Sequence, residues 1–325
     1  MALDGPFYDE LQIGMTIPPL PPVTFTDADN VIYRAITGDQ HLPSVDVRSF
    51  AALGGVGALV NPGLVMQYAI GQTTGATRRA IANLYYRTVR IHRTVSVGET
   101  LSTTTVVLGL ADASPKDGLH RGKVWLGIES RTDAGVVMTC ERCALLPCRE
   151  PISPGHRTDI PAPADADPLA TFAGQVPNWD LTSLPTTDWV VGEVRDDPMR
   201  DHVDLAPALA RMTFNQALLH RDHTRTVYGK RLVYGGHVQA LAQASLTRML
   251  PGMATVLGWD ACDHLGPAFE GDLLGFKHKL LDTHELDGQG RLLRFEVTGR
   301  LVTGDETVDN AARDLLRWST VVLAP

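Results

Sequence analysis

An internal repeat constrains the fold of this 325-residue chain more than any other feature of its sequence. At an offset of 176, the positions Thr37, Asp39, Ser44 and Asp46 match Thr213, Asn215, His220 and Asp222. At an offset of 173, Gly63 matches Gly236 and the pair Gly98-Glu99 matches Gly271-Asp272. A three-residue deletion in the second copy explains the change of offset. The ordered matches predict two similar halves, and two unrelated α+β domains with similar turns are the alternative.

A proline-rich segment separates the two halves. Between Arg149 and about Pro185, prolines stand at 151, 154, 161, 163 and 168 with Asp, Ala and Ser between them. This composition disfavours both helices and central strands. Each flanking piece has an ordinary domain size. We therefore expect a first domain over residues 1–149, a linker over 150–186 and a second domain over 187–325.

Each half is predicted to contain helices followed by strands. In the first half we expect a strand-like start at 7–17, helices at 27–38 and 62–73, and strands at 82–95, 100–110, 123–132 and 136–146. In the second half we expect helices near 205–219 and 236–250 and strands near 273–280, 291–303 and 315–323. Both halves therefore read as α+β, with an antiparallel sheet and one long apolar helix for the sheet to wrap.

Composition argues against several classes of protein. The net charge of −8 leaves no basic field for nucleic acid. The first ten residues hold acidic side chains and no long apolar run, which argues against a signal peptide or membrane anchor and favours the cytoplasm. We expect Cys140, Cys143, Cys148 and Cys262 to be buried reduced thiols. Neither a dinucleotide-binding fingerprint nor a P-loop is present, so we expect no cofactor and no metal.

Three stretches carry a family resemblance that covers nearly the full length. They are Ala82-Asn83-Leu84-Tyr85-Tyr86, Tyr234-Gly235-Gly236-His237-Val238 and Gly266-Pro267-Ala268-Phe269-Glu270-Gly271-Asp272. The sequence resembles the MaoC-like hydratases and dehydratases, near the 2-methylfumaryl-CoA (mesaconyl-CoA) hydratase branch and bacterial 3-hydroxyacyl-thioester dehydratases. The resemblance implies a double hotdog, in which two tandem antiparallel sheets each wrap a long central helix, with the chemistry kept in one half.

The family motif is an Asp, four intervening residues and a His, followed by a Gly that opens the central helix. The first half keeps the acid at Asp39 but has Ser44 in place of the histidine. The second half keeps His220 but has Asn215 in place of the acid, a change similar to that in the mesaconyl-CoA hydratase branch. We therefore expect a degenerate site beside the acyl chain in the first half, and the catalytic site in the second.

Hydration of an α,β-unsaturated thioester needs a base for water, an acid for the α-carbon and donors for the oxygen of the thioester. We assign His220 as general acid and base, because imidazole exchanges protons near neutral pH. Asn215 cannot titrate and is assigned as the partner that positions the water. Gly236 is assigned as the oxyanion donor at the positive end of the helix dipole. The alternative is that Gly235-Gly236 merely permits a tight turn.

Further residues are candidates for substrate binding. We expect contacts from Gly235 and from His237, although His237 could instead pack on Tyr234. The basic residues Lys230, Arg231, Lys277 and Lys279 could bind the CoA phosphates, or they could be ordinary exposed side chains. Asp222 is a candidate support for the catalytic loop or an ordinary helix cap.

The leading hypothesis is reversible hydration of a trans-2-enoyl-CoA to a (3R)-3-hydroxyacyl-CoA, the stereochemistry being implied by the resemblance. The resemblance implies a role in fatty acid metabolism, with the acyl group carried either on CoA or on an acyl carrier protein. A mesaconyl-CoA-type hydratase, a hotdog thioesterase and a non-catalytic acyl-thioester binder are the alternatives. We expect a monomeric pseudo-dimer or a homodimer of double hotdogs, with no nucleic-acid or membrane partner.

Overall fold

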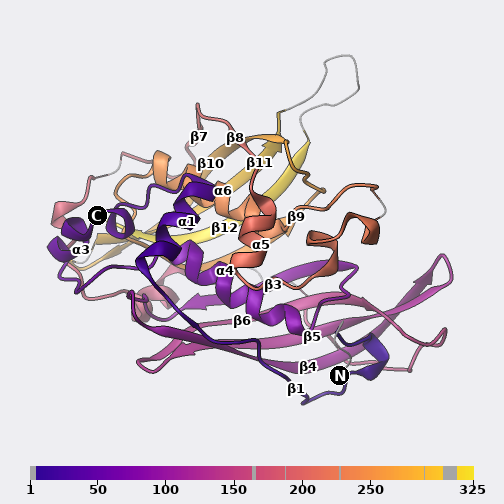
Figure 1. The fold of residues 1–325 in the computed structure, drawn as a ribbon. Coiled ribbons are helices and arrows are strands. Elements are labelled where there is room, and N and C mark those ends of the chain that lie inside the picture. Colours follow the sequence, from indigo (N-terminus) through magenta and orange to yellow (C-terminus); the bar gives the residue numbers. More distant parts are fainter. Residues whose placement is uncertain (1–4, 163–165, 187, 227, 289, 303–312) are drawn as a thin grey trace.

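One antiparallel sheet runs through both halves of the chain (Figure 1). The computed structural model describes residues 5–162, 166–186, 188–226, 228–288, 290–302 and 313–325. The long strands are β3 (Ala82–Ile91), β4 (Thr100–Lys116), β5 (Leu119–Thr132), β6 (Gly135–Pro147), β9 (Thr255–His264), β10 (Leu273–Leu286), β11 (Gly290–Leu301) and β12 (Asp314–Ala324). Short strands β1 (Thr16–Ile17), β2 (Val23–Thr24), β7 (Val194–Asp196) and β8 (Asp201–His202) pair with β4 or β10.

The strand order confirms the repeat. From the centre outwards, the first half runs β3-β6-β5-β4 and the second half runs β9-β12-β11-β10. The halves join where Val89 and Arg90 of β3 pair with Trp259 and Gly258 of β9. A Cβ at Gly258 would lie 2.3 Å from the Val89 carbonyl oxygen, so only glycine permits this close approach. Two copies of one topology therefore share a continuous sheet, which is the double hotdog expected from the sequence.

Two long apolar helices lie against the sheet, one from each half. They are α4 (Pro62–Gln72), in which every residue is buried, and α6 (Gly235–Met249). Pro62 occupies the first turn of α4, where a missing N–H costs nothing. The two helices touch through Gln67, whose Nε2 donates to the Gly236 carbonyl at 2.9 Å and to Gln239 Oε1 at 2.8 Å. The middle of α4 is thus tied to the first turns of α6 across the halves.

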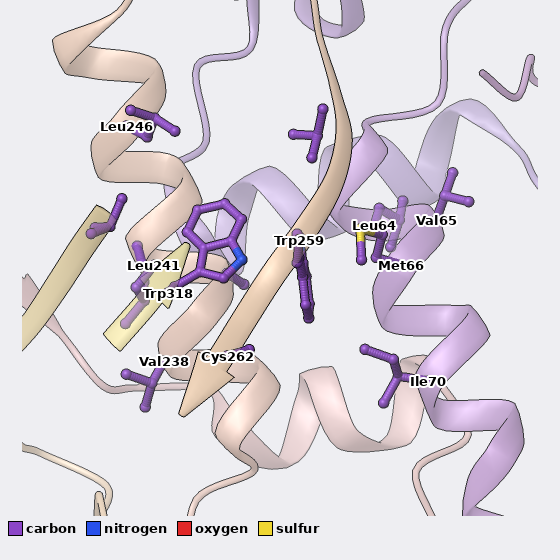
Figure 2. Packing of buried hydrophobic residues seen from close by; sticks show 14 of the residues in the cluster. Leu64, Val65, Met66, Ile70, Val238, Leu241, Leu246, Trp259, Cys262 and Trp318 are labelled. Atoms are coloured by element: carbon purple, nitrogen blue, oxygen red, sulfur yellow. The ribbon is translucent and has the colours of Figure 1, made fainter. Parts of the chain in front are cut away.

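Aromatic side chains fill the space between the two helices. Figure 2 shows Trp259 of β9 between Leu64 and Met66 of α4 on one side and Trp318 of β12 on the other. The rings of Trp259 and Trp318 pack edge to face with centroids 5.7 Å apart. One hydrophobic cluster includes residues from both halves, so the core does not stop at the boundary between them.

Smaller helices connect these elements. They are α1 (Asp27–Thr37), α2 (Leu42–Val45), α3 (Val47–Ala52), α5 (Ala206–Met212) and the 3₁₀ turns η1 (Tyr8–Glu10), η2 (Thr73–Gly75), η3 (Leu169–Gln175), η4 (Leu181–Ser183), η5 (Leu218–His220) and η6 (His223–Arg225). The proline-rich segment contains η3 and η4 but no α-helix or strand among its described residues. None of the helices in the described ranges is long and apolar enough to cross a membrane. All four cysteines are buried and free, as expected.

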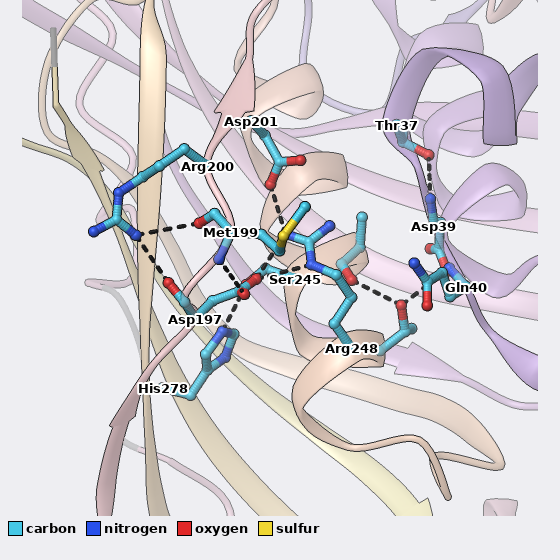
Figure 3. Close-up of polar contacts among 12 residues, drawn as sticks. Thr37, Asp39, Gln40, Asp197, Met199, Arg200, Asp201, Ser245, Arg248 and His278 are labelled. Carbon is cyan, nitrogen blue, oxygen red and sulfur yellow. Dashed lines mark hydrogen bonds and ion pairs between the residues drawn. The ribbon is translucent and has the colours of Figure 1, made fainter.

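A buried ionic cluster lies at the C-terminal end of α6 (Figure 3). Asp197 Oδ2 accepts hydrogen bonds from Arg248 Nη2 at 2.6 Å and from Ser245 Oγ at 2.6 Å. The Ser245 hydroxyl also contacts His278 Nε2 at 2.8 Å, and Arg248 reaches Asp201 at 2.6 Å. These contacts connect α6 to β10 and to the segment between β7 and β8. The cluster therefore fixes one end of the helix while the other end borders the candidate site.

The structure departs from the expected elements at three places. The helix expected near 205–219 ends at Met212, because Phe214 has a φ of +58° that an α-helix cannot contain. Only the short turn η5 follows it. The strand β9 was not expected, since Gly258, Asp260 and Asp263 interrupt its apolar pattern. The strand expected at 7–17 is reduced to η1 and β1.

Candidate active site

A cavity of about 320 Å³ opens at the N-terminal end of α6. Both halves of the chain line it. The second half contributes Asn215, Ala217, Leu219, His220, Tyr228, Leu232, Val233, Tyr234, Gly235, Val238, His264, Leu265, Gly266, Pro267, Ala268 and Leu315, and the first half contributes Ile70, Thr74, Ala80, Ile81, Ala82, Asn83, Tyr86 and Arg142. The apolar helix α4 of the first half borders this cavity through Ile70.

Asn215 lies in the wall of this cavity on a loop that both halves hold. Its Oδ1 accepts a hydrogen bond from the Ala217 amide at 3.0 Å, which leaves its Nδ2 as the free donor. Thr74 of the first half holds the same loop, because its hydroxyl accepts from the Gln216 amide at 2.9 Å. The positive φ of Phe214 turns the chain immediately before Asn215. The amide side chain is therefore fixed and presents a donor.

His220 lies in the same wall, at the end of η5. Its Nδ1 is 3.1 Å from the Leu232 carbonyl oxygen. A carbonyl oxygen only accepts hydrogen bonds, so Nδ1 carries the proton and Nε2 keeps its lone pair in the neutral ring. Burial lowers the pKa of His220 to about 4; the hydrogen bond to Leu232 opposes this shift and the charge of Arg142 adds to it. At neutral pH the ring is an uncharged base with a defined tautomer.

The first turn of α6 supplies unpaired backbone donors. Within the described part of the chain, the amides of Gly235 and Gly236 donate no hydrogen bond to protein. Gly235 lines the cavity, whereas the Cα of Gly236 faces Gln67 and Tyr234, where a Cβ would come within 2.3 Å of each side chain. Gly236 is thus required for close packing of α4 and α6, and Gly235 is the glycine beside the cavity.

Sequence reasoning missed His264, the last residue of β9. Its imidazole packs on the start of α6, since a Cβ on Gly235 would lie 2.5 Å from His264 Cε1. His264 lines the cavity together with His220. The internal repeat could have predicted the position of His264. The bounds of β3, shifted by 173 positions, coincide with the bounds of β9. That shift would have placed His264 at a strand end next to the family-like stretch beginning at Gly266.

The first half contributes Asn83 and Arg142, which sequence reasoning also did not assign. Asn83 lies in one of the stretches that carry the family resemblance, and it accepts a hydrogen bond from Arg142 Nε at 2.6 Å. Arg142 follows Glu141 in an otherwise mostly apolar strand β6, and its place in the cavity wall with His220 depends on the pairing of the two halves. The cavity is therefore a joint product of both halves.

The corresponding region of the first half keeps only a small pocket of about 10 Å³, whose lining includes Val60, Pro62 and Ile91. Asp39 is 1% exposed and its two oxygens accept from the His41 amide at 2.8 Å and from Gln243 Nε2 at 2.9 Å. Ser44, the counterpart of His220, is bonded to His41. With its acid satisfied internally and its histidine replaced, this half has no comparable group facing a cavity among the described residues.

Lys230 and Arg231 are not among the residues that line the cavity, but they directly precede Leu232, which does line it. The Lys230 Nζ sits 3.9 Å from the centroid of the Phe269 ring, and Arg231 pairs with Glu270 at 3.0 Å. Both contacts hold the loop whose residues Gly266 to Ala268 line the cavity. Asp222 accepts from the Thr224 amide at 2.9 Å, so it caps η6. Of its two expected roles, the structure places it in the capping one.

The structure does not bring Lys277 and Lys279 to the site. The intervening His278 points to Ser245 of α6, so the two lysines project from the opposite face of the sheet. No residue of β10 is among those that line the cavity. His237 also lies outside the wall: it is fully buried, and neither ring nitrogen has a hydrogen-bond partner among the described residues. These three positions do not share the space that holds His220.

His237→Leu is expected to stabilise the protein by roughly 1–3 kcal/mol at pH 7, because it removes a buried polar group without partners. The counterpart of His237 in the first half is Leu64, which is fully buried. Urea unfolding followed by circular dichroism measures the change. A loss of stability would contradict this prediction, and loss of hydration activity in a folded variant would instead show that His237 contacts the substrate.

The same variant tests a pH dependence. Burial lowers the pKa of His237 to about 4. Between about pH 6.5 and pH 4 the unfolded ring binds a proton that the folded ring does not, so acidification lowers the free energy of unfolding. This histidine accounts for at most about 3 kcal/mol of that loss. The stability of His237→Leu should therefore fall less steeply than that of the wild type over this range.

Two curated relatives align with most of the chain, although no family model matches it. A beta-methylmalyl-CoA dehydratase of Chloroflexus aurantiacus is 28% identical and the alignment covers 83% of this chain and 80% of the relative. A mesaconyl-CoA hydratase of Cereibacter sphaeroides is 27% identical, with coverage of 88% and 86%. Both names describe addition or removal of water on a CoA thioester.

Solved structures match over the full length. A conserved hypothetical protein of Mycobacterium tuberculosis with a double hotdog fold is 34% identical, with a TM-score of 0.87 and 99% coverage of both chains. A putative MaoC domain dehydratase from Chloroflexus aurantiacus shares the fold, with a TM-score of 0.83, 24% identity and coverage of 99% of this chain and 97% of the other. This chain belongs to the MaoC-like double-hotdog family of hydratases and dehydratases.

Proposed function

We propose that this protein reversibly adds water to the double bond of a trans-2-enoyl-CoA thioester in the cavity around His220. The observation that supports this most is the neutral imidazole of His220, held through Nδ1 by the Leu232 carbonyl, in a cavity beside free helix amides. The names of the relatives support the same reaction class. Catalysis belongs to the second half, residues 187–325, and the first half completes the walls.

In the hydration direction, His220 Nε2 takes a proton from water as the oxygen bonds to the β-carbon of the enoyl group. The electrons of the double bond move towards the thioester oxygen, and the α-carbon then takes a proton from the imidazolium. One water is consumed and the ring returns to its neutral form. The depressed pKa of His220 favours return of the proton, since the charged ring is the less stable form in this site.

Negative charge that develops on the thioester oxygen needs donors. We assign this role to the amides of Gly235 and Gly236 at the N-terminus of the fifteen-residue helix α6, where the helix dipole also favours an anion. Asn215 Nδ2 is assigned to hold the attacking water. His264 is assigned to contact the substrate from the other side of Gly235. Lys230 and Arg231, which precede the cavity-lining Leu232, remain candidate contacts for CoA.

The direct test is a panel of enoyl-CoA thioesters that includes crotonyl-CoA, longer enoyl-CoA and mesaconyl-CoA. Hydration removes the conjugated enoyl-thioester absorbance without releasing thiol, which a thiol reagent reports separately. We expect absorbance loss alone with at least one substrate. Release of free CoA would indicate a thioesterase, and calorimetric binding of every substrate without turnover would indicate a non-catalytic binder.

A further inference from the structure

Arg142 is a buried cation in the wall of the cavity. It lies on β6 and is only 6% exposed. Its Nε donates to Asn83 Oδ1 at 2.6 Å and its Nη1 donates to Thr73 Oγ1 at 3.0 Å. Both partners are neutral, and Nη2 has no acceptor among the described residues. The guanidinium is thus held in place from one side with donors left over on the other.

Other buried arginines in the described ranges are neutralised by carboxylates. Arg294, which is also 6% exposed, pairs with Asp260 at 2.6 Å. Arg248 pairs with Asp197 and with Asp201, each at 2.6 Å. No carboxylate pairs with Arg142 in the part of the chain that the structure describes. The adjacent Glu141 is occupied by other groups, Arg87 at 3.2 Å and Trp125 Nε1 at 3.0 Å.

The fold itself does not require an arginine at this position. Tyr86 of β3 pairs with Arg142, and its counterpart in the repeat, Trp259 of β9, pairs with Thr320. Thr320 donates to the Gly258 carbonyl within its own sheet. The second half therefore builds the same strand pair with a small neutral residue. An isolated buried charge is costly unless it is paired, so the cation at Arg142 calls for a ligand that supplies an anion.

We propose that Arg142 binds a carboxylate on the acyl group of the substrate, so that this enzyme prefers monothioesters of unsaturated dicarboxylic acids. Arg142 Nη2 would donate a charge-assisted hydrogen bond to one carboxylate oxygen, and Nδ2 of Asn83 would donate to the other. Arg142 lines the same cavity as His220 and His264, so the carboxylate lies close to the reacting double bond. This inference rests on the proposed hydration function.

The test compares substrates that differ only at the end of the acyl group. Fumaryl-CoA carries a carboxylate where crotonyl-CoA carries a methyl group. We expect kcat/KM for hydration to favour fumaryl-CoA by roughly 100-fold, as for a charged hydrogen-bonded pair in a buried site. In Arg142→Gln this preference should vanish or reverse. The matched control Arg131→Gln removes a surface charge that is paired with Glu129 at 3.6 Å, and it should keep the wild-type preference.

Binding of unreactive thioesters separates this inference from the proposed reaction. Succinyl-CoA and butyryl-CoA form the corresponding saturated pair, and calorimetry on the wild type should show tighter binding of succinyl-CoA. Because this measurement uses the wild type, it tests the inference even if Arg142→Gln fails to fold. Hydration of crotonyl-CoA as efficiently as fumaryl-CoA, with equal binding of the saturated pair, would overturn the role of Arg142 and leave hydration standing. Preferential binding of succinyl-CoA without hydration of any enoyl-CoA would overturn the proposed hydration and leave the role of Arg142 standing.

Discussion

His220→Ala is expected to lower kcat/KM for enoyl-CoA hydration by roughly 10³-fold, the usual contribution of a positioned general acid and base. The loss follows from the geometry, because Asn215 cannot take a proton and the Leu232 carbonyl orients only the imidazole. The fold should survive, since the His220 side chain borders the cavity and its hydrogen bond among the described residues is the one to the Leu232 carbonyl. Initial rates from the enoyl-thioester absorbance measure the effect, and circular dichroism checks the fold.

His264→Gln is the matched control for this prediction. It also removes an imidazole from the cavity wall, but a contact to substrate without proton transfer accounts for only about tenfold. An equal or larger loss for His264→Gln than for His220→Ala would move the proton-transfer role to His264. Near wild-type turnover in a folded His220→Ala protein would remove His220 from the mechanism.

Asp197→Ala is expected to lower the free energy of unfolding by about 3–5 kcal/mol, the cost of breaking a buried ion pair by removing one partner. Asp197 is 1% exposed and accepts hydrogen bonds from Arg248, from Ser245 and from the Met199 amide at 2.9 Å (Figure 3). Without it, those donors remain buried and Arg248 keeps only Asp201. Because α6 ends in this cluster, the helix that forms the candidate site should unfold more readily.

A surface ion pair provides the comparison for Asp197. Asp188 pairs with Arg195 at 2.9 Å, but its side chain is 87% exposed. Solvent screens such a pair, so Asp188→Ala should change stability much less than Asp197→Ala does. Urea unfolding of both variants against the wild type tests the difference. Equal changes in the free energy of unfolding for the two variants would show that burial of the cluster does not increase its contribution to stability.

Much of the fold could be predicted from the sequence because the repeat is visible in short matches. The apolar helices α4 and α6 were expected within one residue of their bounds, since glycine and proline mark their first turns. The early end of α5 could not be predicted, because it depends on a positive φ at Phe214 that tertiary contacts hold. Strand β9 was hidden by its polar residues, although the repeat pointed to it.

The candidate site was only half visible in the sequence. His220, Asn215 and Gly235 lie together because one loop and one helix end carry them. Arg142 and Asn83 come from strands of the other half, and no local pattern places them beside His220. Conversely, Lys277, Lys279 and His237 had suitable chemistry but face away from the cavity. Charge and spacing suggested those residues, whereas the face of the sheet or helix decided where they lie.

Hydration in D₂O followed by NMR tests the central claim most directly. Incubation of an enoyl-CoA substrate with the wild-type protein in D₂O should give a 3-hydroxyacyl thioester with the hydroxyl on the β-carbon and one deuterium on the α-carbon, and no free CoA. His220→Ala at the same concentration should leave the vinyl signals in place. Unchanged vinyl signals with the wild type across the whole substrate panel, fumaryl-CoA included, would contradict the account.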